Sequence, residues 1–303
     1  MNNISSDFKS AFIALVGRPN CGKSTLLNTI LGEQLSIVTP MPQTTRRNIR
    51  GIYNGEGYQL VFVDTPGFHR GKHALNKALY KQITDIFSDA GIDILCYLVD
   101  LSRSFGKEED EIAKMVENMK ISVYIVFNKA DLCSSVDEKI KSFFSQYPKL
   151  ASLPYISISA ISPSAREIFL EAIQPVIPSG PHYYPEEDIT DLNLRFFAAE
   201  YIRKQIIELT HEEVPHAAFV EIIDYKEYED KHVVNATIHV ETQGQKGIVI
   251  GKQGKVINQI KKQAAKELSE LAGAPVNIIC HVTVTPKWRD NNQFLNEMGL
   301  DIQ

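Results

Sequence analysis

The stretch GRPNCGKS, residues 17–24, decides the fold of this chain. It directly follows the apolar run AFIALV at residues 11–16, which is typical of a buried strand, and it leads into a helix-forming run at residues 23–31. The pattern G-x-x-x-x-G-K-[ST] lets the backbone curl at its glycines, so that N–H groups point inward around phosphate oxygens. The dipole of the following helix favours an anion at the same place. The stretch therefore predicts a phosphate-binding loop, and its position after the first strand argues against a plain glycine turn.

The region from residue 11 to residue 174 alternates strand-like and helix-like segments. Runs rich in β-branched and aromatic residues predict buried strands at 11–16, 59–63, 94–99, 123–127 and 155–158. Helix-forming stretches lie between them, at about 23–31, 74–90, 107–119, 136–147 and 164–174. A further strand at about 48–54 is expected to pair antiparallel with the 58–63 strand across Gly55-Glu56-Gly57. The sequence thus predicts a doubly wound α/β domain with a mostly parallel sheet over residues 1–174.

A linker and a second domain follow. Prolines and a Ser-Gly pair gather at residues 175–189, which is the composition of a linker. The predicted elements that follow are a helix near 190–211, strands at about 216–225 and 231–242, a short apolar turn at 247–250, a helix at 255–271 and a strand at 276–286. A glycine-punctuated stretch separates the second strand from the helix at 255–271, and the order of the domain is interpreted as α-β-β-α-α-β. This order predicts a small α+β domain over residues 190–303, with a C-terminal tail.

Composition restricts the function classes. The net charge of −5 argues against a chain that coats nucleic acid indiscriminately, although it leaves room for a local basic surface. No apolar run approaches the roughly 20 residues that span a bilayer, and residues 1–10 lack the features of a signal peptide. The four cysteines lie far apart and are interpreted as free thiols in a reducing cytosol. We therefore expect a cytoplasmic protein.

Two motifs supply the chemistry of a phosphate site. Lys23 can reach β and γ phosphates, and the hydroxyl of Ser24 can ligate Mg²⁺. The second motif, DTPG at residues 64–67, follows a buried strand about forty residues later. There Asp64 can hold the magnesium through water, and the N–H of Gly67 can meet the γ phosphate.

The polar stretch between these motifs, residues 39–47, is expected to be a loop that reorganises with the nucleotide state. It contains QTTR at residues 43–46. Thr45 is the first choice for a magnesium contact, and Thr44 is the alternative.

A third and a fourth motif indicate which nucleotide base is bound. NKAD at residues 128–131 follows the 123–127 strand, and SA at residues 159–160 follows the 155–158 strand. An ionised Asp131 would accept hydrogen bonds from N1–H and the N2 amino group of guanine, both of which adenine lacks. Asn128 would brace the site and the stem of Lys129 would lie against the base. A backbone N–H of the SA pair would lie near guanine O6.

With these motifs in hand, the chain resembles the Era family of GTPases over nearly its whole length. GRPNCGKSTLLN, PQTTRR, DTPGF, NKAD and SA resemble that family's nucleotide motifs, and GQKGIVIGKQGKVINQIKKQA resembles its type II KH domain. The related EngA proteins carry a KH-like domain after two G domains, whereas a single set of nucleotide motifs occurs here. The resemblance implies binding of GTP and GDP, contact with the 3′ region of 16S rRNA, and assistance to assembly of the 30S ribosomal subunit.

The candidate nucleotide-binding residues are those of the four motifs: Gly17, Asn20, Cys21, Gly22, Lys23, Ser24, Thr25, Asp64, Thr65, Pro66, Gly67, Asn128, Lys129, Asp131, Ser159 and Ala160. The candidate catalytic residues are Lys23, Thr45, Gly67 and Asn20, and the candidate magnesium contacts are Ser24, Thr45 and Asp64.

Two positions bear on the rate of hydrolysis. In Ras-like proteins a glutamine after the DxxG glycine positions the attacking water, but Phe68 stands there and cannot hydrogen-bond a water. We therefore expect slow intrinsic hydrolysis. Asn20 resembles the asparagine that helps to hold a potassium ion in related GTPases. A turn residue that tolerates unusual dihedrals is an interpretation of comparable weight.

The downstream loop GKQG, residues 251–254, fits the GxxG loop of KH domains. Its glycines permit close approach of a nucleic-acid backbone, and the adjoining groove holds about four nucleotides. Six lysines without an intervening Asp or Glu lie between residues 246 and 266 and form a local cationic patch. A solvated lysine-rich helix face is the less favoured alternative. The candidate RNA-binding residues are Lys246, Ile250, Gly251, Lys252, Gln253, Gly254 and Lys255.

The favoured hypothesis is a GTP-hydrolysing switch whose KH domain binds single-stranded ribosomal RNA. Two alternatives stay open at this point. The chain could act chiefly as an RNA-binding assembly factor whose affinity the nucleotide tunes, or as a GTPase that associates peripherally with the inner face of the membrane through its basic surface. No obligate protein partner follows from the sequence.

Overall fold

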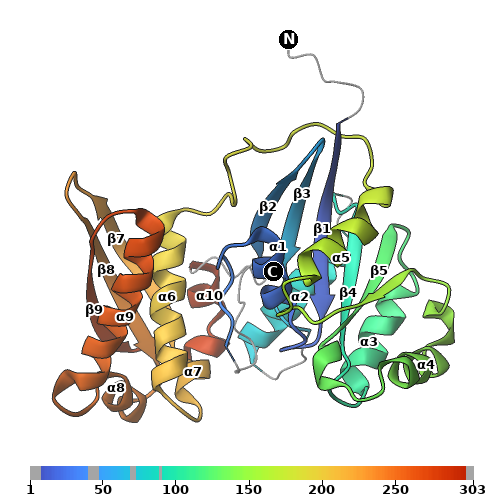
Figure 1. Ribbon diagram of the computed structural model, residues 1–303. Coiled ribbons are helices and arrows are strands. Elements are labelled where there is room, and N and C mark those ends of the chain that lie inside the picture. The colour runs from blue at the N-terminus through green and yellow to red at the C-terminus, as the bar shows by residue number, and fades with distance from the viewer. Residues whose placement is uncertain (1–7, 40–47, 69–72, 89–90, 298–303) are drawn as a thin grey trace. The chain divides into compact units, whose positions relative to one another are not determined.

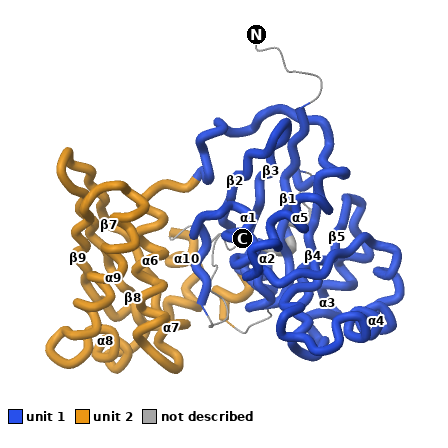
Figure 2. The backbone as a smooth tube through the Cα atoms, in the orientation of Figure 1, with its two compact units in different colours: residues 1–71, 79–191 blue, residues 72–78, 192–303 orange. Residues whose placement is uncertain are grey.

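The computed structural model describes residues 8–39, 48–68, 73–88 and 91–297 (Figure 1). The chain divides into two compact units, residues 1–71 with 79–191 and residues 72–78 with 192–303 (Figure 2). None of the described helices is both long and apolar enough to cross a membrane. Each unit has a sheet and a core of its own.

Unit 1 is built on a six-stranded sheet in the order β2-β3-β1-β4-β5-β6. The strands are β1 (Lys9–Gly17), β2 (Ile49–Gly55), β3 (Tyr58–Asp64), β4 (Ile94–Asp100), β5 (Ser122–Asn128) and β6 (Tyr155–Ser157). Only β2 runs antiparallel, in a hairpin with β3. The predicted doubly wound fold class is therefore confirmed. Because β1 lies between β3 and β4, its carboxyl end is a switch point of the topology, which is where such sheets bind ligands.

Helices cover both faces of this sheet. On one face, α1 (Lys23–Leu31) and α5 (Ala165–Ile173) pack together, and Phe62 of β3 meets Phe169 of α5 with ring centroids 5.9 Å apart. The other face carries a core cluster that α2 (Ala74–Ser88), α3 (Lys107–Val116) and α4 (Val136–Gln146) help to form. Phe143 of α4 is fully buried there, 5.2 Å from the ring of Phe127 in β5. These apolar layers hold the strand ends that carry the motifs.

The proline-rich segment is docked on unit 1, although its composition is that of a free linker. The side chain of Gln59 in β3 is fully buried and accepts hydrogen bonds from the backbone N–H groups of Tyr183 (2.9 Å) and Tyr184 (3.1 Å). Further along, the Ile52 N–H in edge strand β2 donates to the Ile189 carbonyl at 2.9 Å. The segment therefore satisfies backbone groups that an edge strand would otherwise expose.

Unit 2 has the order α-β-β-α-α-β that the sequence predicts. Its main elements are α6 (Leu194–Leu209), β7 (Phe219–Glu227), β8 (His232–Val240), α8 (Gln243–Ile250), α9 (Lys255–Ala272) and β9 (Val276–Val284), with the short helices α7 (Val214–Ala217) and α10 (Asn292–Glu297) in addition. The sheet order is β7-β8-β9, with β8 and β9 parallel. The fully buried Trp288 anchors the segment after β9 through its Nε1–H, which donates to the Ala217 carbonyl at 2.7 Å.

One local prediction is wrong. Residues 247–250, expected as a short apolar turn, are the last turn of helix α8. A capping box begins this helix: Thr242 Oγ1 accepts from the Gln245 N–H at 3.2 Å, and Gln245 Oε1 accepts from the Thr242 N–H at 3.1 Å. The burial of Val249 then fixes the helix against unit 2.

Candidate nucleotide and RNA sites

The phosphate-binding loop begins where β1 ends, and its glycines are required by close packing. A Cβ on Gly22 would lie 2.1 Å from Asn128 Nδ2, and its φ of 100° is one that glycine adopts readily. A Cβ on Gly17 would lie 2.5 Å from the Leu98 carbonyl oxygen. Asn20 has a φ of 61°, in the left-handed region where asparagine is tolerated. The loop thus leads directly into the N-terminus of α1 at Lys23.

The structure brings the predicted phosphate and magnesium residues together. Lys23 is 5% exposed, and its Nζ donates to the carbonyls of Gly17 (3.2 Å) and Arg18 (3.0 Å), so the ammonium lies at the rim of the loop. Ser24 Oγ donates to Asp64 Oδ2 at 2.7 Å. A hydroxyl and a carboxylate at this separation are the oxygen donors that Mg²⁺ prefers. Thr44 and Thr45 lie outside the described residues, so the choice between them stays a prediction.

The DTPG segment packs directly on the loop. A Cβ on Gly67 would lie 2.6 Å from the Cα of Pro19, so the two backbones touch. The N–H of Phe68 donates to the Gly17 carbonyl at 3.0 Å. The Phe68 side chain is 1% exposed and its ring lies 5.1 Å from that of Tyr80. Phe68 is therefore a core residue and offers nothing to an attacking water.

Asn128 is the central brace of the base site. Its Nδ2 donates to the Cys21 carbonyl at 2.8 Å and its Oδ1 accepts from the Ala160 N–H at 2.9 Å. The hydroxyl of Thr29 in α1 donates to the Ala160 carbonyl at 2.7 Å. One buried amide thus joins the phosphate loop, the NKAD motif and the SA motif. Because the Ala160 N–H is already engaged, guanine O6 would have to share that donor.

Asp131, the predicted base reader, lies at the surface of unit 1. It is exposed in a short helical turn at Ala130–Leu132, and its carboxylate has no hydrogen-bond or ion-pair partner within the part of the chain that the structure describes. Lys129, directly before this turn, has a φ of 61°. Its Nζ is held by Asp100 Oδ2 at 2.8 Å, which stretches the aliphatic stem along the site.

The remaining predicted residues differ in burial. Thr65 is fully buried and its hydroxyl donates to the Leu15 carbonyl at 2.8 Å, so its role is to fix β1 beside the end of β3. Pro66 is buried, while Thr25 and Ser159 are half-buried. All four are predicted nucleotide contacts, and the Thr65 hydroxyl is engaged by the Leu15 carbonyl instead.

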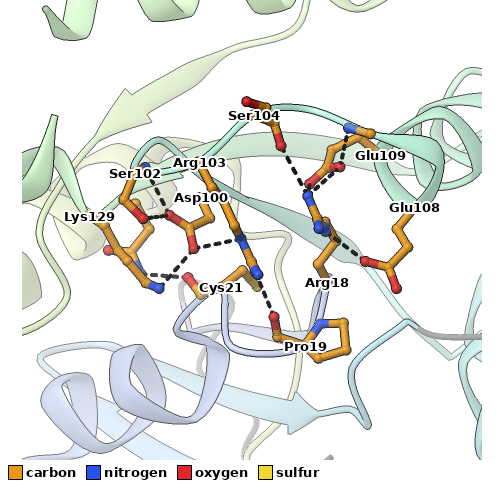
Figure 3. Close-up of polar contacts among 12 residues, drawn as sticks. Arg18, Pro19, Cys21, Asp100, Ser102, Arg103, Ser104, Glu108, Glu109 and Lys129 are labelled. Atoms are coloured by element: carbon orange, nitrogen blue, oxygen red, sulfur yellow. Dashed lines mark hydrogen bonds and ion pairs between the residues drawn. The ribbon is translucent and has the colours of Figure 1, made fainter. Parts of the chain in front are cut away.

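A group of charged side chains that the motifs did not predict contacts the phosphate loop: Asp100, Arg103, Glu108 and Glu109 (Figure 3). Arg18 Nη1 donates to Glu109 Oε2 at 2.8 Å, and Arg103 Nη2 donates to a loop carbonyl at 2.6 Å. The position of Asp100 in the sequence could have indicated its role, because it ends a buried parallel strand beside the loop.

The GxxG loop lies between α8 and α9 in unit 2. Gly251, Gln253 and Gly254 have φ values of 72°, 55° and 74°. A Cβ on Gly251 would lie 2.4 Å from Val256 Cγ2, so this position requires glycine. Lys252 and Gln253 are exposed at the tip. The loop therefore presents its backbone and two polar side chains to solvent.

The flanking residues continue this surface. Lys255, the first residue of α9, is exposed, while Lys246 and Ile250 on α8 are half-buried. Ile248 on α8 is 47% exposed beside them. Apolar and basic side chains therefore lie together on this surface.

Comparison with known proteins finds matches to both units. A family model described as 50S ribosome-binding GTPase matches residues 12–129, and a model of the KH domain matches residues 213–289. GTPase Era of Geotalea uraniireducens (strain Rf4) is 40% identical over 297 residues, which are 97% of this chain and 98% of that protein. GTPase Era of Clostridium perfringens (strain 13 / Type A) is 39% identical over 295 residues, which are 96% of this chain and 98% of that protein.

Two solved structures agree over a similar length. Era in complex with MgGDPNP and nucleotides 1506–1542 of 16S ribosomal RNA has a TM-score of 0.91 and 31% identity, covering 97% of this chain and 100% of that chain. A variant of Aquifex aeolicus Era bound to GDP·AlF4⁻ also has a TM-score of 0.91, with 30% identity and the same coverage of both chains.

The fold and the sites define the class: this is a P-loop GTPase whose G domain is followed by a KH domain. The relatives narrow the class further, because they match across both domains and nearly from end to end. The chain belongs to the Era family of GTPases.

Proposed function

We propose that this protein is a GTP-hydrolysing switch that binds the 3′ region of 16S rRNA through its KH domain and assists assembly of the 30S subunit. The observation that carries the proposal is that one chain holds both a carboxylate open to a guanine base, on Asp131, and an open GxxG loop at residues 251–254. The likeness to Era bound to 16S rRNA nucleotides supports the RNA assignment. We assign GTP binding to residues 1–174, the docked linker to 175–189 and RNA binding to 190–303.

The nucleotide-binding half of the proposal rests on the base reader and the phosphate loop. Guanine would donate two hydrogen bonds to Asp131, and charge-assisted bonds of this kind contribute roughly 1.5–3 kcal/mol each. Lys23 would exchange its loop carbonyls for phosphate oxygens. Ser24 and Asp64 would hold Mg²⁺, which neutralises charge on the β and γ phosphates when bound.

Hydrolysis without a partner is expected to be slow, on the order of 10⁻⁴–10⁻³ s⁻¹. Phe68 is buried, and nothing else in the described part of the site is a general base, so positioning and charge neutralisation must supply most of the rate. Asn20, held in a left-handed conformation beside the phosphates, is the proposed ligand for a potassium ion that would add positive charge there.

The RNA half of the proposal rests on local charge. The protein carries a net charge of −5, yet the GxxG loop is flanked by lysines without carboxylates. Phosphates of a single strand would lie against the loop backbone and Lys252, and bases would lie against the apolar groove beside Ile250. We propose a cytoplasmic location. A weak peripheral association with the membrane is the second candidate, favoured only by this basic surface.

Crosslinking of the protein to RNA in cells, followed by sequencing of the bound RNA, tests the proposal. Enrichment of the 3′ region of 16S rRNA is the expected result, and enrichment that disappears with Lys252→Asp would assign it to the GxxG loop. GTP turnover is then measured with and without 30S subunits. A turnover that the subunit changes indicates a switch, whereas an unchanged turnover indicates an assembly factor whose RNA affinity the nucleotide tunes. Flotation with anionic liposomes tests the membrane alternative. An even spread of crosslinks over total RNA would overturn the proposal.

A further inference from the structure

The carboxylate of Asp100 is the meeting point of the charged cluster behind the phosphate loop. Asp100 ends β4, opposite Asn128 in β5, and its side chain is 1% exposed. Its Oδ2 pairs with Lys129 Nζ at 2.8 Å and with Arg103 Nε at 3.0 Å. Its Oδ1 accepts from the Ser102 N–H at 2.9 Å and from the Ser102 hydroxyl at 2.5 Å. A buried carboxylate thus has two cations and two neutral donors around it.

Arg103 extends this cluster to the phosphate loop (Figure 3). While Asp100 holds its Nε, Nη2 donates to the Pro19 carbonyl at 2.6 Å. Pro19 in turn packs against Gly67, whose Cβ position lies 2.6 Å from the Pro19 Cα. The contacts therefore form a continuous series from Lys129 of the NKAD motif to Gly67 of the DTPG motif.

We propose that Asp100 and Arg103 are positioning residues that couple the base site to the phosphate loop of this GTPase. Asp100 fixes Lys129 under the guanine, and Arg103 fixes the turn of the loop at Pro19 and Asn20. The inference rests on the proposed function, since it assigns a task in GTP binding and hydrolysis to residues outside the four motifs.

The electrostatics of the cluster agree with this assignment. Burial acts to raise the pKa of Asp100, but hydrogen bonds from Lys129 and Ser102 outweigh it and the pKa is lowered. The carboxylate is therefore ionised at neutral pH. Removing one partner of such a buried cluster leaves an uncompensated charge, so a conservative substitution at Asp100 should have a large effect.

Substitutions at the two residues should affect different steps, GDP release for Asp100 and GTP hydrolysis for Arg103. Asp100→Asn loosens Lys129 beneath the base, so we expect the rate of GDP release to rise at least tenfold. Arg103→Ala frees the turn at Pro19, so we expect the single-turnover rate of GTP hydrolysis to fall about tenfold while GDP affinity changes less than threefold. Arg103→Lys keeps a cation between the same acceptors and should restore the hydrolysis rate to within threefold of wild type. A residue that served only stability would not separate binding from hydrolysis in this way.

The test uses the full-length chain, a fluorescent GDP analogue for release and a phosphate assay for single turnover. Lys107→Ala is the matched control: this exposed lysine begins α3 in the same segment, and the described residues give its side chain no hydrogen bond or ion pair. Binding of 16S rRNA fragments and the thermal unfolding midpoint report folding. If Asp100→Asn does not fold, the Arg103 pair of variants still decides the matter.

Failure of the proposed function and failure of the proposed coupling give different results. A wild-type protein that binds no GTP would remove the proposed function itself. If the wild type binds GTP but Asp100→Asn and Arg103→Ala both behave like Lys107→Ala, only the proposed coupling is contradicted. Equal loss of hydrolysis in Arg103→Ala and Arg103→Lys would likewise overturn the positioning role.

Discussion

Two glycine-rich loops in this chain are proposed to receive phosphates, and they are built in opposite ways. The loop at residues 17–24 is held by side chains from distant elements, among them Asn128 of β5 and Arg103 after β4. The loop at residues 251–254 is held by its own backbone, with the Gly251 N–H donating to the Gly247 carbonyl at 2.8 Å and the Gly254 N–H to the Gly251 carbonyl at 3.0 Å. In the described structure, no side chain from another element bonds to this second loop.

The difference follows from the two ligands. Phosphoryl transfer depends on donors already aimed at the transition state, so a loop fixed by several elements raises the rate. An RNA strand presents many equivalent phosphates, and these contacts position the strand without reading its sequence. A loop that is shaped locally and open to solvent is sufficient for that task.

The largest contrast between the loops is expected from glycine substitutions. Gly22→Ala would drive a Cβ to 2.1 Å from Asn128 Nδ2 at a φ of 100°, and would break the brace between phosphate loop and base site. We expect GTP affinity to fall by roughly 1,000-fold or more, about 4 kcal/mol. Gly254→Ala meets only ordinary contacts, the nearest 3.7 Å away, and incurs mainly left-handed strain of about 1–2 kcal/mol.

Titration calorimetry with GTP for the first variant and with an RNA fragment for the second measures both decreases in affinity. Comparable decreases at the two glycines would mean that the loops are equally constrained. That result would contradict the proposed difference between the two loops.

A somewhat smaller effect is expected at the base reader. Asp131→Asn replaces an acceptor by a donor opposite the guanine N2 amino group, so GTP affinity should fall roughly a hundredfold, about 2.7 kcal/mol, and preference should shift toward xanthosine triphosphate. Competition binding with both nucleotides measures the shift. Asp137→Asn at the start of α4 is a matched control, because it makes the same change at an exposed first-turn residue. Unaltered GTP binding in Asp131→Asn would show that this carboxylate does not read the base.

The RNA loop should respond to charge. Replacing Lys252 and Gln253 with Asp puts two carboxylates where phosphates pass, and Asp tolerates the left-handed φ of 55° at position 253. Binding to a single-stranded 16S rRNA fragment should weaken at least roughly tenfold, or about 1.4 kcal/mol, with GTP affinity unchanged. Fluorescence anisotropy measures it, and Lys231→Asp in the β7–β8 turn controls for a general change of charge. RNA affinity equal to wild type in a folded double variant would make the second unit a protein-docking module.

Most of the fold could be predicted because its signals are local. The parallel strands of unit 1 are rich in apolar residues, and each motif follows one of them, so the position of the phosphate and base residues could be inferred from order alone. The last turn of helix α8 was predicted as a non-helical turn because two glycines and an Ile-Val-Ile run favour a turn or strand locally. Its capping box, Thr242 with Gln245, was the signal that could have identified it.

The missed parts of the site depend on contacts that no pattern encodes. Asp100 pairs with Lys129, which follows another strand, and Arg103 donates to a backbone carbonyl. The sequence around Asp100 and Arg103 carries no pattern that indicates these partners. The linker is a similar case. Its composition indicates a free segment, but the buried amide of Gln59, more than 120 residues earlier, holds it against the sheet.

The smallest effect distinguishes a phosphate-binding lysine from a solvated lysine on α9. Lys262 is exposed and Lys261 is half-buried. Burial raises the pKa of the Cys280 thiol to about 12, and the positive charge of Lys261 acts in the opposite direction.

Removing one lysine that neutralises a phosphate of a single strand should lower the slope of log affinity against log salt by about 0.7. We expect Lys262→Ala to weaken RNA binding only two- to threefold, about 0.5 kcal/mol, and to flatten the slope by that amount for any RNA sequence. Lys261→Gln, which removes the charge and keeps a polar side chain, should do the same if the Lys261 ammonium reaches the RNA. Anisotropy over a salt series measures both slopes, with Lys266→Ala as the control at the far, 80% exposed position on the same helix. Parallel salt plots for all three variants and wild type would leave these lysines as solvated charges and would confine the RNA surface to the GxxG loop itself.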